Sequence, residues 1–251
     1  MKNISIPNID YFKVLDAYTG EMTYGCDQEW FSTEWQRRAG CAPCVACNIL
    51  LYLNRARTGD EGTPVQKKFC EEFMDEIWTY VTPTERGMPS TEMFCDDVRS
   101  YGEAKRDEIE CVSFDIPNDA ADRPTAGEVS TFLEESLAND LPVAFLNLCN
   151  GSEKNLPEWH WVTIVSMKQE TRDSHIFIVI VDEGALKTID LSLWLDTTSN
   201  GGGFVRFSYA SASDKYAGSV YGEASTRHNG TIHLISGSGD LLLGVCLDEQ
   251  S

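Results

Sequence analysis

Positive charge is scarce in this chain. Its 20 lysine and arginine residues face 40 aspartates and glutamates, which gives a formal net charge of −20 at pH 7. Such a surface repels phosphate groups, so we expect neither nucleic acid nor an anionic membrane as a partner. An acidic excess of this kind is typical of a charge that keeps a protein in solution.

Long apolar runs are also missing. The longest are HIFIVIV and LLLGV, which have the length of a strand rather than of a membrane span. The first residues, MKNISIPNIDYF, lack the basic start and apolar stretch of a secretory signal. We therefore expect a cytoplasmic protein. The nine cysteines form an odd number, so we interpret most of them as reduced, buried thiols.

Apolar residues at helical spacing predict four helices in the first 140 residues. The first begins near Cys41, and the second follows Thr63, where a capping-box pattern ends at Gln66. The third covers about 90–101 and stops at Gly102. The inner face of the second helix is predicted at Val65, Phe69, Phe73, Ile77 and Val81. The fourth begins at Thr125, with Glu128 three residues later.

Short β-branched segments replace this pattern after Asp140. We expect strands at 142–149, 160–167, 174–182, 186–189 and 204–209, and one earlier strand at 111–116. A helical half followed by a mostly antiparallel sheet predicts an α+β fold. Residues 1–210 would form the catalytic domain. Residues 211–251 have a Ser-, Ala- and Gly-rich texture and would form a β-rich extension or complete the same domain.

The segment Gly40-Cys41-Ala42-Pro43 places a thiol at a helix start. The positive end of the helix dipole favours the thiolate there, which is the nucleophilic form of cysteine. Pro43 suits the first helical turn, where its missing N–H costs nothing. Gln36, five residues before Cys41, is a candidate donor to an oxyanion, together with the Cys41 backbone N–H.

His160 opens a predicted strand between two tryptophans, and Asp182 ends the strand after it. An imidazole within reach of a thiol activates it as a nucleophile. A carboxylate on the neighbouring strand would accept the second imidazole N–H and orient the ring. Asp182 is our first candidate for this role, and Asp190 is the alternative.

Cys41, Cys44 and Cys47 share the C-x2-C-x2-C spacing of some iron–sulfur proteins. On a regular helix, however, residues six apart point more than about 100° away from each other. Zinc bound by Cys41, Cys44 and a distant histidine is a second metal hypothesis. We expect Cys44 and Cys47 to be buried thiols of a core helix, and no cofactor or metal.

Taken in order, these elements resemble the C39-like branch of the papain-like cysteine peptidases. The resemblance covers about residues 35–208 and includes Gln36, Gly40-Cys41-Ala42-Pro43, Leu141-Pro142-Val143, His160-Trp161 and Asp182. It implies a papain-like fold in which Cys41 is the nucleophile, His160 the base, Asp182 the orienting residue and Gln36 the oxyanion donor. Ala42 departs from the glycine that is usual after the nucleophile.

The predicted activity is thiol-dependent acyl transfer, with hydrolysis of a peptide or amide bond as the first choice of reaction. The substrate would carry an amide or thioester carbonyl. Two alternatives stay open at this point. One is an enzyme that passes the acyl group to an amine, as a transglutaminase does, and the other is a binding domain of the same fold without catalysis.

Overall fold

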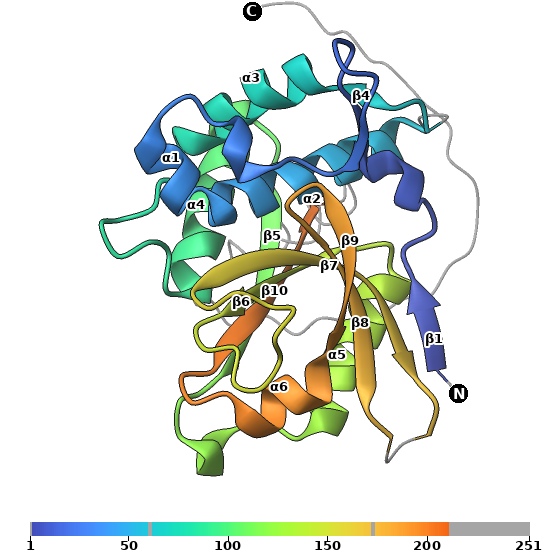
Figure 1. Cartoon of the computed structure of the whole chain (residues 1–251), viewed down its shortest axis with the longest axis vertical. Coiled ribbons are helices and arrows are strands. Elements are labelled where there is room, and N and C mark those ends of the chain that lie inside the picture. The colour runs from blue at the N-terminus through green and yellow to red at the C-terminus, as the bar shows by residue number, and fades with distance from the viewer. Residues whose placement is uncertain (1, 60–61, 172–173, 211–251) are drawn as a thin grey trace, which may run out of the picture. The chain divides into compact units, whose positions relative to one another are not determined.

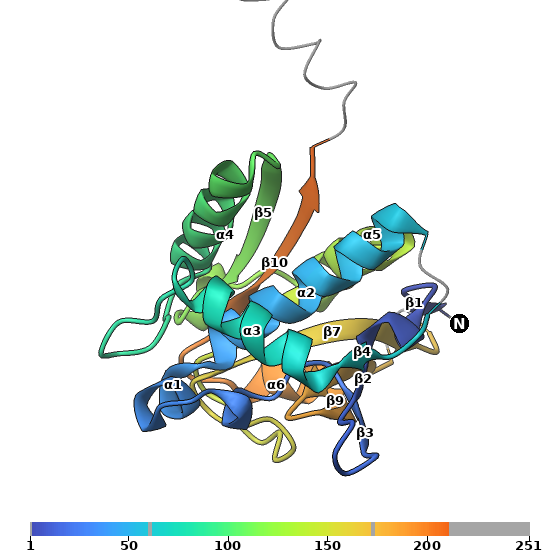
Figure 2. The same ribbon diagram turned by 90° about the horizontal axis from the view of Figure 1, so that it is seen from above.

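The computed structural model describes residues 2–59, 62–171 and 174–210 (Figures 1 and 2). The predicted extension at 211–251 lies outside these residues. The helices are α1 (Glu34–Ala39), α2 (Cys41–Thr58), α3 (Lys67–Trp78), α4 (Thr91–Lys105), α5 (Ala126–Ala138) and α6 (Leu191–Thr197). The strands are β1 (Lys2–Ser5), β2 (Lys13–Leu15), β3 (Met22–Tyr24), β4 (Val65–Gln66), β5 (Ile109–Ile116), β6 (Val143–Asn147), β7 (His160–Gln169), β8 (Ile176–Asp182), β9 (Ala185–Asp190) and β10 (Gly202–Tyr209).

An antiparallel sheet forms the centre of the fold, in the order β5-β10-β6-β7-β8-β9. β1 pairs with the second half of β7, beyond the part that β6 occupies. A smaller sheet has the order β3-β2-β4 and includes the parallel pair β2–β4. The structure therefore confirms a mixed helical and antiparallel architecture, although the strands are not confined to the second half of the chain.

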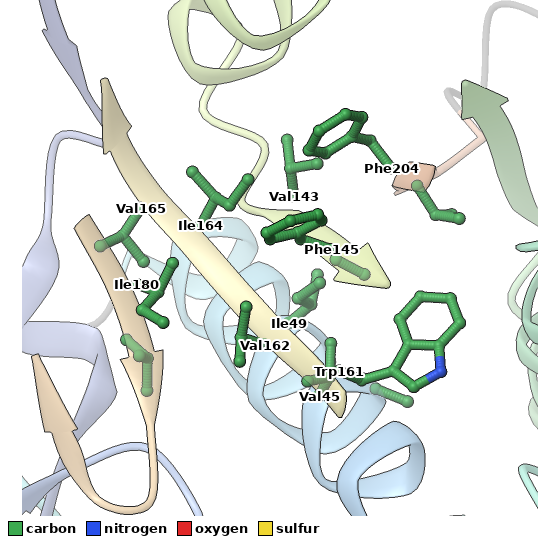
Figure 3. Close-up of a cluster of buried hydrophobic side chains, with 14 of the residues drawn as sticks. Val45, Ile49, Val143, Phe145, Trp161, Val162, Ile164, Val165, Ile180 and Phe204 are labelled. Atoms are coloured by element: carbon green, nitrogen blue, oxygen red, sulfur yellow. The ribbon is translucent and has the colours of Figure 1, made fainter. Parts of the chain in front are cut away.

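Helix α2 packs on β7 and β6. Figure 2 shows it lying along β7. Figure 3 shows Val45 and Ile49 of α2 lying beside Val162 and Trp161 of β7 in one cluster of buried side chains. Ala42, Val45, Ala46, Ile49 and Leu50, which recur at helical spacing along α2, are all buried. This packing fixes the start of α2 close to the start of β7.

Two of the predicted helices differ from the structure. Val65 and Gln66 pair with β2, so their backbone is extended and the capping box expected after Thr63 does not form. α3 begins at Lys67 instead. Ile77 and Val81 are buried as predicted, but Cys70 and Met74 complete the buried face, while Phe69 is 52% exposed. α4 continues through Gly102 to Lys105 and ends at Arg106, which takes the left-handed conformation of a helix cap; Gly102 instead allows close packing against the Asp107 backbone.

Helix α5 begins as its sequence predicts. The Thr125 side chain accepts a hydrogen bond from the Glu128 N–H, and the Glu128 carboxylate accepts one from the Thr125 N–H. This reciprocal pair satisfies two backbone donors at the helix start. Helix α1, in contrast, is an element that the sequence pattern did not predict.

Candidate active site

Cys41 is the first residue of α2 and directly follows the short helix α1. Its side chain is partly buried, and it lies at the N-terminal, positive end of an 18-residue helix. Helix starts also leave backbone N–H groups without partners inside the helix. The location therefore suits both a thiolate and a developing oxyanion.

Gly40 joins the two helices, and the space around it explains why a glycine is needed. A Cβ at this position would lie 2.4 Å from the Gln36 carbonyl oxygen and 2.6 Å from a ring carbon of Phe31. These distances are far below van der Waals contact. Gly40 thus allows α1 and Phe31 to pack directly behind the Cys41 backbone.

His160 begins β7 and pairs with Asn147 at the end of β6. The ring is 8% exposed, and its Nε2 lies 2.6 Å from the Asp182 Oδ1. Its remaining nitrogen, Nδ1, is then the one available to Cys41, which lines the same hollow and contributes to raising the pKa of the imidazole. Cys41, His160 and Asp182 thus line one hollow between the start of α2 and the end of β8, with a hydrogen bond between the imidazole and the carboxylate.

The pKa of His160 reflects two opposing effects. Burial lowers it, but the hydrogen bonds with Asp182 and Cys41, together with their negative charges, prevail and raise the pKa from 6.5 to about 10. The imidazole therefore keeps its proton at neutral pH. A protonated imidazole next to a cysteine is the arrangement that favours a thiolate.

Asp182 is 6% exposed, and both of its oxygens are occupied. Oδ1 accepts from His160, and Oδ2 accepts from the Lys187 Nζ at 2.8 Å. Burial raises the pKa of Asp182, but the hydrogen bonds and positive charges of His160 and Lys187 together outweigh burial, so the pKa lies below its usual value. Lys187 also donates to Glu183 at 2.7 Å. Asp182 is thus a charged, fixed acceptor for the imidazole.

Asp190, the alternative orienting residue, lies elsewhere. Its Oδ2 is 2.7 Å from the Nδ1 of His175, and its Oδ1 accepts from the Leu193 N–H at the start of α6. It therefore contacts a different, exposed histidine and caps a helix. Between the two alternatives that the sequence left open, the structure brings Asp182 to His160.

Gln36 is not brought to this site. Its side-chain oxygen accepts hydrogen bonds from Thr33 and Ser32 and completes a capping box at the start of α1. The hollow beside the site contains another glutamine, Gln28, together with Cys41, His160 and Asp182. Local spacing does not point to Gln28, because twelve residues and a complete helix separate it from Cys41.

The segment that carries Gln28 is tied to the elements of the site. Asn48 of α2 accepts a hydrogen bond from the Cys26 N–H at 2.7 Å. Tyr24 donates its N–H to the carbonyl of Gly184, in the Glu183-Gly184 turn that directly follows Asp182. The chain before Gln28 therefore bridges the nucleophile helix and the β8–β9 turn.

Lys187 was also missed, although the sequence contains a signal for it. Glu183-Gly184 is a two-residue turn between β8 and β9, and both residues have positive φ. Such a turn fixes the register, in which Asp182 faces Ala185. Lys187 then lies on the same face as Asp182, two residues further along, which is within reach of a long side chain.

Cys44 and Cys47 are buried thiols of α2, and all eight cysteines in the described ranges are free. The Cys47 Sγ lies 3.4 Å from that of Cys26, beneath the site. Burial raises the pKa of Cys47 to about 11 and that of Cys44 well above its usual value. Within the described part of the chain, no cluster of three histidine, cysteine or acidic side chains fits a metal ion.

No helix among the described residues is long and apolar enough to cross a membrane. Comparison of the sequence with protein families and with curated proteins finds no match. Comparison with solved structures finds, among other matches, the crystal structure of UfSP from C. elegans, with 11% sequence identity and a TM-score of 0.48. The match covers 83% of this chain and 34% of that one, so this chain spans about a third of the length of its structural neighbour.

Proposed function

We propose that the chain is a cysteine-dependent acyl-transfer enzyme that hydrolyses a peptide or amide bond. The observation that carries this proposal is the grouping of Cys41, His160 and Asp182 around one hollow, with the imidazole hydrogen-bonded to the carboxylate. A nucleophile, a base and an orienting group in this order form the common arrangement of thiol hydrolases.

In the proposed reaction the Cys41 thiolate attacks the substrate carbonyl carbon and forms a C–S bond. The carbonyl electron pair moves to oxygen and then returns as the C–N bond breaks. The His160 imidazolium gives its proton to the departing amine, which leaves a thioester and a neutral imidazole. His160 next takes a proton from water, whose oxygen attacks the thioester, and the thiolate and imidazolium are restored.

The tetrahedral intermediate needs donors for its negative oxygen. We assign this role to the Cys41 backbone N–H and to the side-chain amide of Gln28, in place of Gln36. The position of Gln28 in the same hollow as Cys41 and His160 supports this choice, and so does the use of the Gln36 oxygen as a helix cap. Removing such a donor from a hydrolase costs about 10²–10³ in kcat.

Membership of the papain-like superfamily is part of the proposal. Two features support this membership. Helix α2 begins with the proposed nucleophile, and antiparallel strands of the sheet on which it packs carry the histidine and the aspartate. We also retain the C39-like branch as a proposal. It is supported by the order of Gly40-Cys41-Ala42-Pro43, His160-Trp161 and Asp182 in the sequence.

Alkylation with iodoacetamide, followed by peptide mapping, tests whether Cys41 is activated. We expect Cys41 to react at least tenfold faster than Cys44, whose buried thiol has a raised pKa. Cys149 is a necessary comparison, because hydrogen bonds from Ser199 lower the pKa of this partly exposed thiol. The measurement is therefore made in a Cys149→Ser background, with Cys41→Ala as the negative control.

The outcome decides the proposal. If Cys41 reacts no faster than Cys44, or if His160→Gln leaves its rate unchanged, the activated-thiol mechanism is wrong. When Cys41 is activated, a peptide library incubated with and without added amines distinguishes hydrolysis from transfer. Hydrolysis yields free acids in both mixtures, whereas an amine-dependent enzyme yields new amides.

A further inference from the structure

A second hollow shares Cys41 and Trp161 with the site but is otherwise lined by different residues, and its volume is about 270 Å³. Trp161 and Met88 are buried there and provide an apolar surface. Trp35 and Trp159 also line it, although they are 43% and 56% exposed. Large apolar side chains left open to water at a cleft are typical of a binding surface.

Two unpaired positive charges border the same cleft, namely Arg38 and Arg86. Within the described ranges, most lysine and arginine side chains form an ion pair with a carboxylate or a hydrogen bond to a backbone carbonyl. The four side chains without any such partner are those of Arg38, Arg86, Arg106 and Lys154. The acidic Glu85 also lines the cleft, so its arginine and glutamate side chains together carry a net charge of +1. This is an exception in a chain of net charge −20.

The backbone that carries Arg86 is firmly held. Thr84 and Gly87 exchange two backbone hydrogen bonds, of 3.0 and 2.8 Å, around the turn that contains Glu85 and Arg86. The next residue, Met88, accepts a hydrogen bond from the Trp161 Nε1 at 2.8 Å. The turn is therefore fixed to β7, close to the beginning of the strand.

The position of His160 tells which part of a substrate this cleft would receive. In the proposed reaction the imidazolium protonates the leaving amine, so the amine side lies toward His160. His160 lines the first hollow and not the second. The second hollow contains Cys41 without the imidazole, and the part of the substrate that stays bonded to sulfur is its acyl segment.

Resting on the proposed function, we infer that this cleft binds the acyl segment of an acidic peptide. An apolar side chain of the substrate lies between Trp35 and Trp159. A substrate carboxylate lies at the border of the cleft, where it pairs with the guanidinium groups of Arg38 and Arg86. The enzyme thus selects a negatively charged substrate in spite of its own acidic surface, because the local charge has the opposite sign.

A matched pair of alkylating probes tests this inference, namely succinyl-Phe and acetyl-Phe chloromethyl ketone. Both deliver the same aromatic group to Cys41, and only the succinyl probe carries a carboxylate. The measured quantity is the ratio of their labelling rates at Cys41 in the full chain. We expect the succinyl probe to react faster, and the advantage to shrink as salt is added.

Variants locate the charge effect. Arg38→Gln and Arg86→Gln should each lower the succinyl-to-acetyl ratio by about threefold, the size expected for an exposed ion pair. Glu85→Gln should raise the ratio, because it removes a repulsive carboxylate. Lys154→Gln is the matched control, since Lys154 also lacks a partner but lies outside this cleft. It should leave the ratio unchanged.

The outcomes separate this inference from the proposed function. A ratio at or below one, or a ratio that Lys154→Gln lowers as much as Arg38→Gln, overturns the inference even when iodoacetamide shows an activated Cys41. Slow iodoacetamide labelling of Cys41 overturns the proposal of an activated thiol. The succinyl-to-acetyl ratio still reports whether the cleft prefers a carboxylate. Binding can also be compared without any reaction. In the Cys41→Ala variant, succinyl-Phe amide should quench tryptophan fluorescence at lower concentration than acetyl-Phe amide does.

Discussion

The charge of His160 depends on the buried carboxylate of Asp182 and on the neighbouring Cys41. The pKa of His160 is raised from 6.5 to about 10, so the stability contributed by its charged form is complete below pH 6.5 and is lost as the pH rises through about 10. Asp182→Asn should lower the pKa of His160, because a neutral amide does not attract the imidazolium. Titration of the imidazole protons by NMR measures the change.

Unfolding in urea offers a second measurement. The difference in free energy of unfolding between the wild type and Asp182→Asn should be largest near pH 6 and should shrink toward pH 10. Asp190→Asn is the matched control, since it should lower the pKa of His175 and leave that of His160 unchanged. An equal His160 pKa in the wild type and Asp182→Asn would contradict the prediction.

Lys187 acts on the site through Asp182 and is a positioning residue. Lys187→Met should raise the pKa of Asp182 and slow the iodoacetamide labelling of Cys41 by about fivefold, the size of a partly exposed charge interaction. The acidic limb of the pH–rate profile should move to higher pH. Lys187→Arg should restore much of the rate, whereas a profile that keeps its shape would point to a purely structural role.

Gln28 and Gln36 are expected to behave differently when each is changed to alanine. Gln28→Ala should lower kcat by about 10²–10³, because an oxyanion donor is lost. Gln36→Ala should leave kcat nearly unchanged and reduce the free energy of unfolding by about 1 kcal/mol, as the loss of a helix cap does. The measurements are kcat for an amide substrate identified in the library and urea unfolding of both variants. If Gln36→Ala lost kcat and Gln28→Ala lost only stability, the assignment would be reversed.

At the scale of elements, the junction between α1 and α2 positions the nucleophile. Gly40→Ala would place a Cβ against the Gln36 carbonyl and the Phe31 ring, and α1 must move to accept it. Overpacking of this kind costs about 1–3 kcal/mol. We expect a lower unfolding midpoint together with slower labelling of Cys41. Gly127→Ala in α5, where the added Cβ has room, is the control and should preserve both.

The same elements show where sequence reasoning succeeds. Thr125 and Glu128 interact over three residues, so their spacing alone predicted the start of α5. The start of α3 could not be predicted in that way, because Val65 and Gln66 are held by β2, some 50 residues earlier in the chain. A local capping pattern was overruled there by a pairing between distant segments.

At the scale of the whole molecule, the site depends on the packing of α2 against the central sheet. Ile49 is fully buried and lies beside Val162 in the cluster of Figure 3. Ile49→Ala should reduce the free energy of unfolding by about 2–5 kcal/mol, through lost burial and the remaining cavity. Urea unfolding measures this change. The exposed Val112→Ala is the matched control and should cost far less.

The sequence by itself determined the chemistry that the chain can offer. A thiol after Gly40, a histidine that opens one strand and an aspartate that ends the next are local patterns, and the antiparallel pairing of β7 with β8 agrees with them. Composition also determined the acidic surface. These features were readable because helix starts, strand ends and short turns depend on residues that are neighbours in sequence.

The tertiary structure alone decided which side chains meet. In the structure Gln36 caps a helix, whereas Gln28 lines the hollow that contains Cys41. Asp182 contacts His160, and Asp190 contacts His175. Trp35, Arg38 and Arg86 line one cleft. The physical reason is that these contacts join segments far apart in the chain. Their geometry is set by how α2 packs on the sheet, and no local spacing encodes that packing.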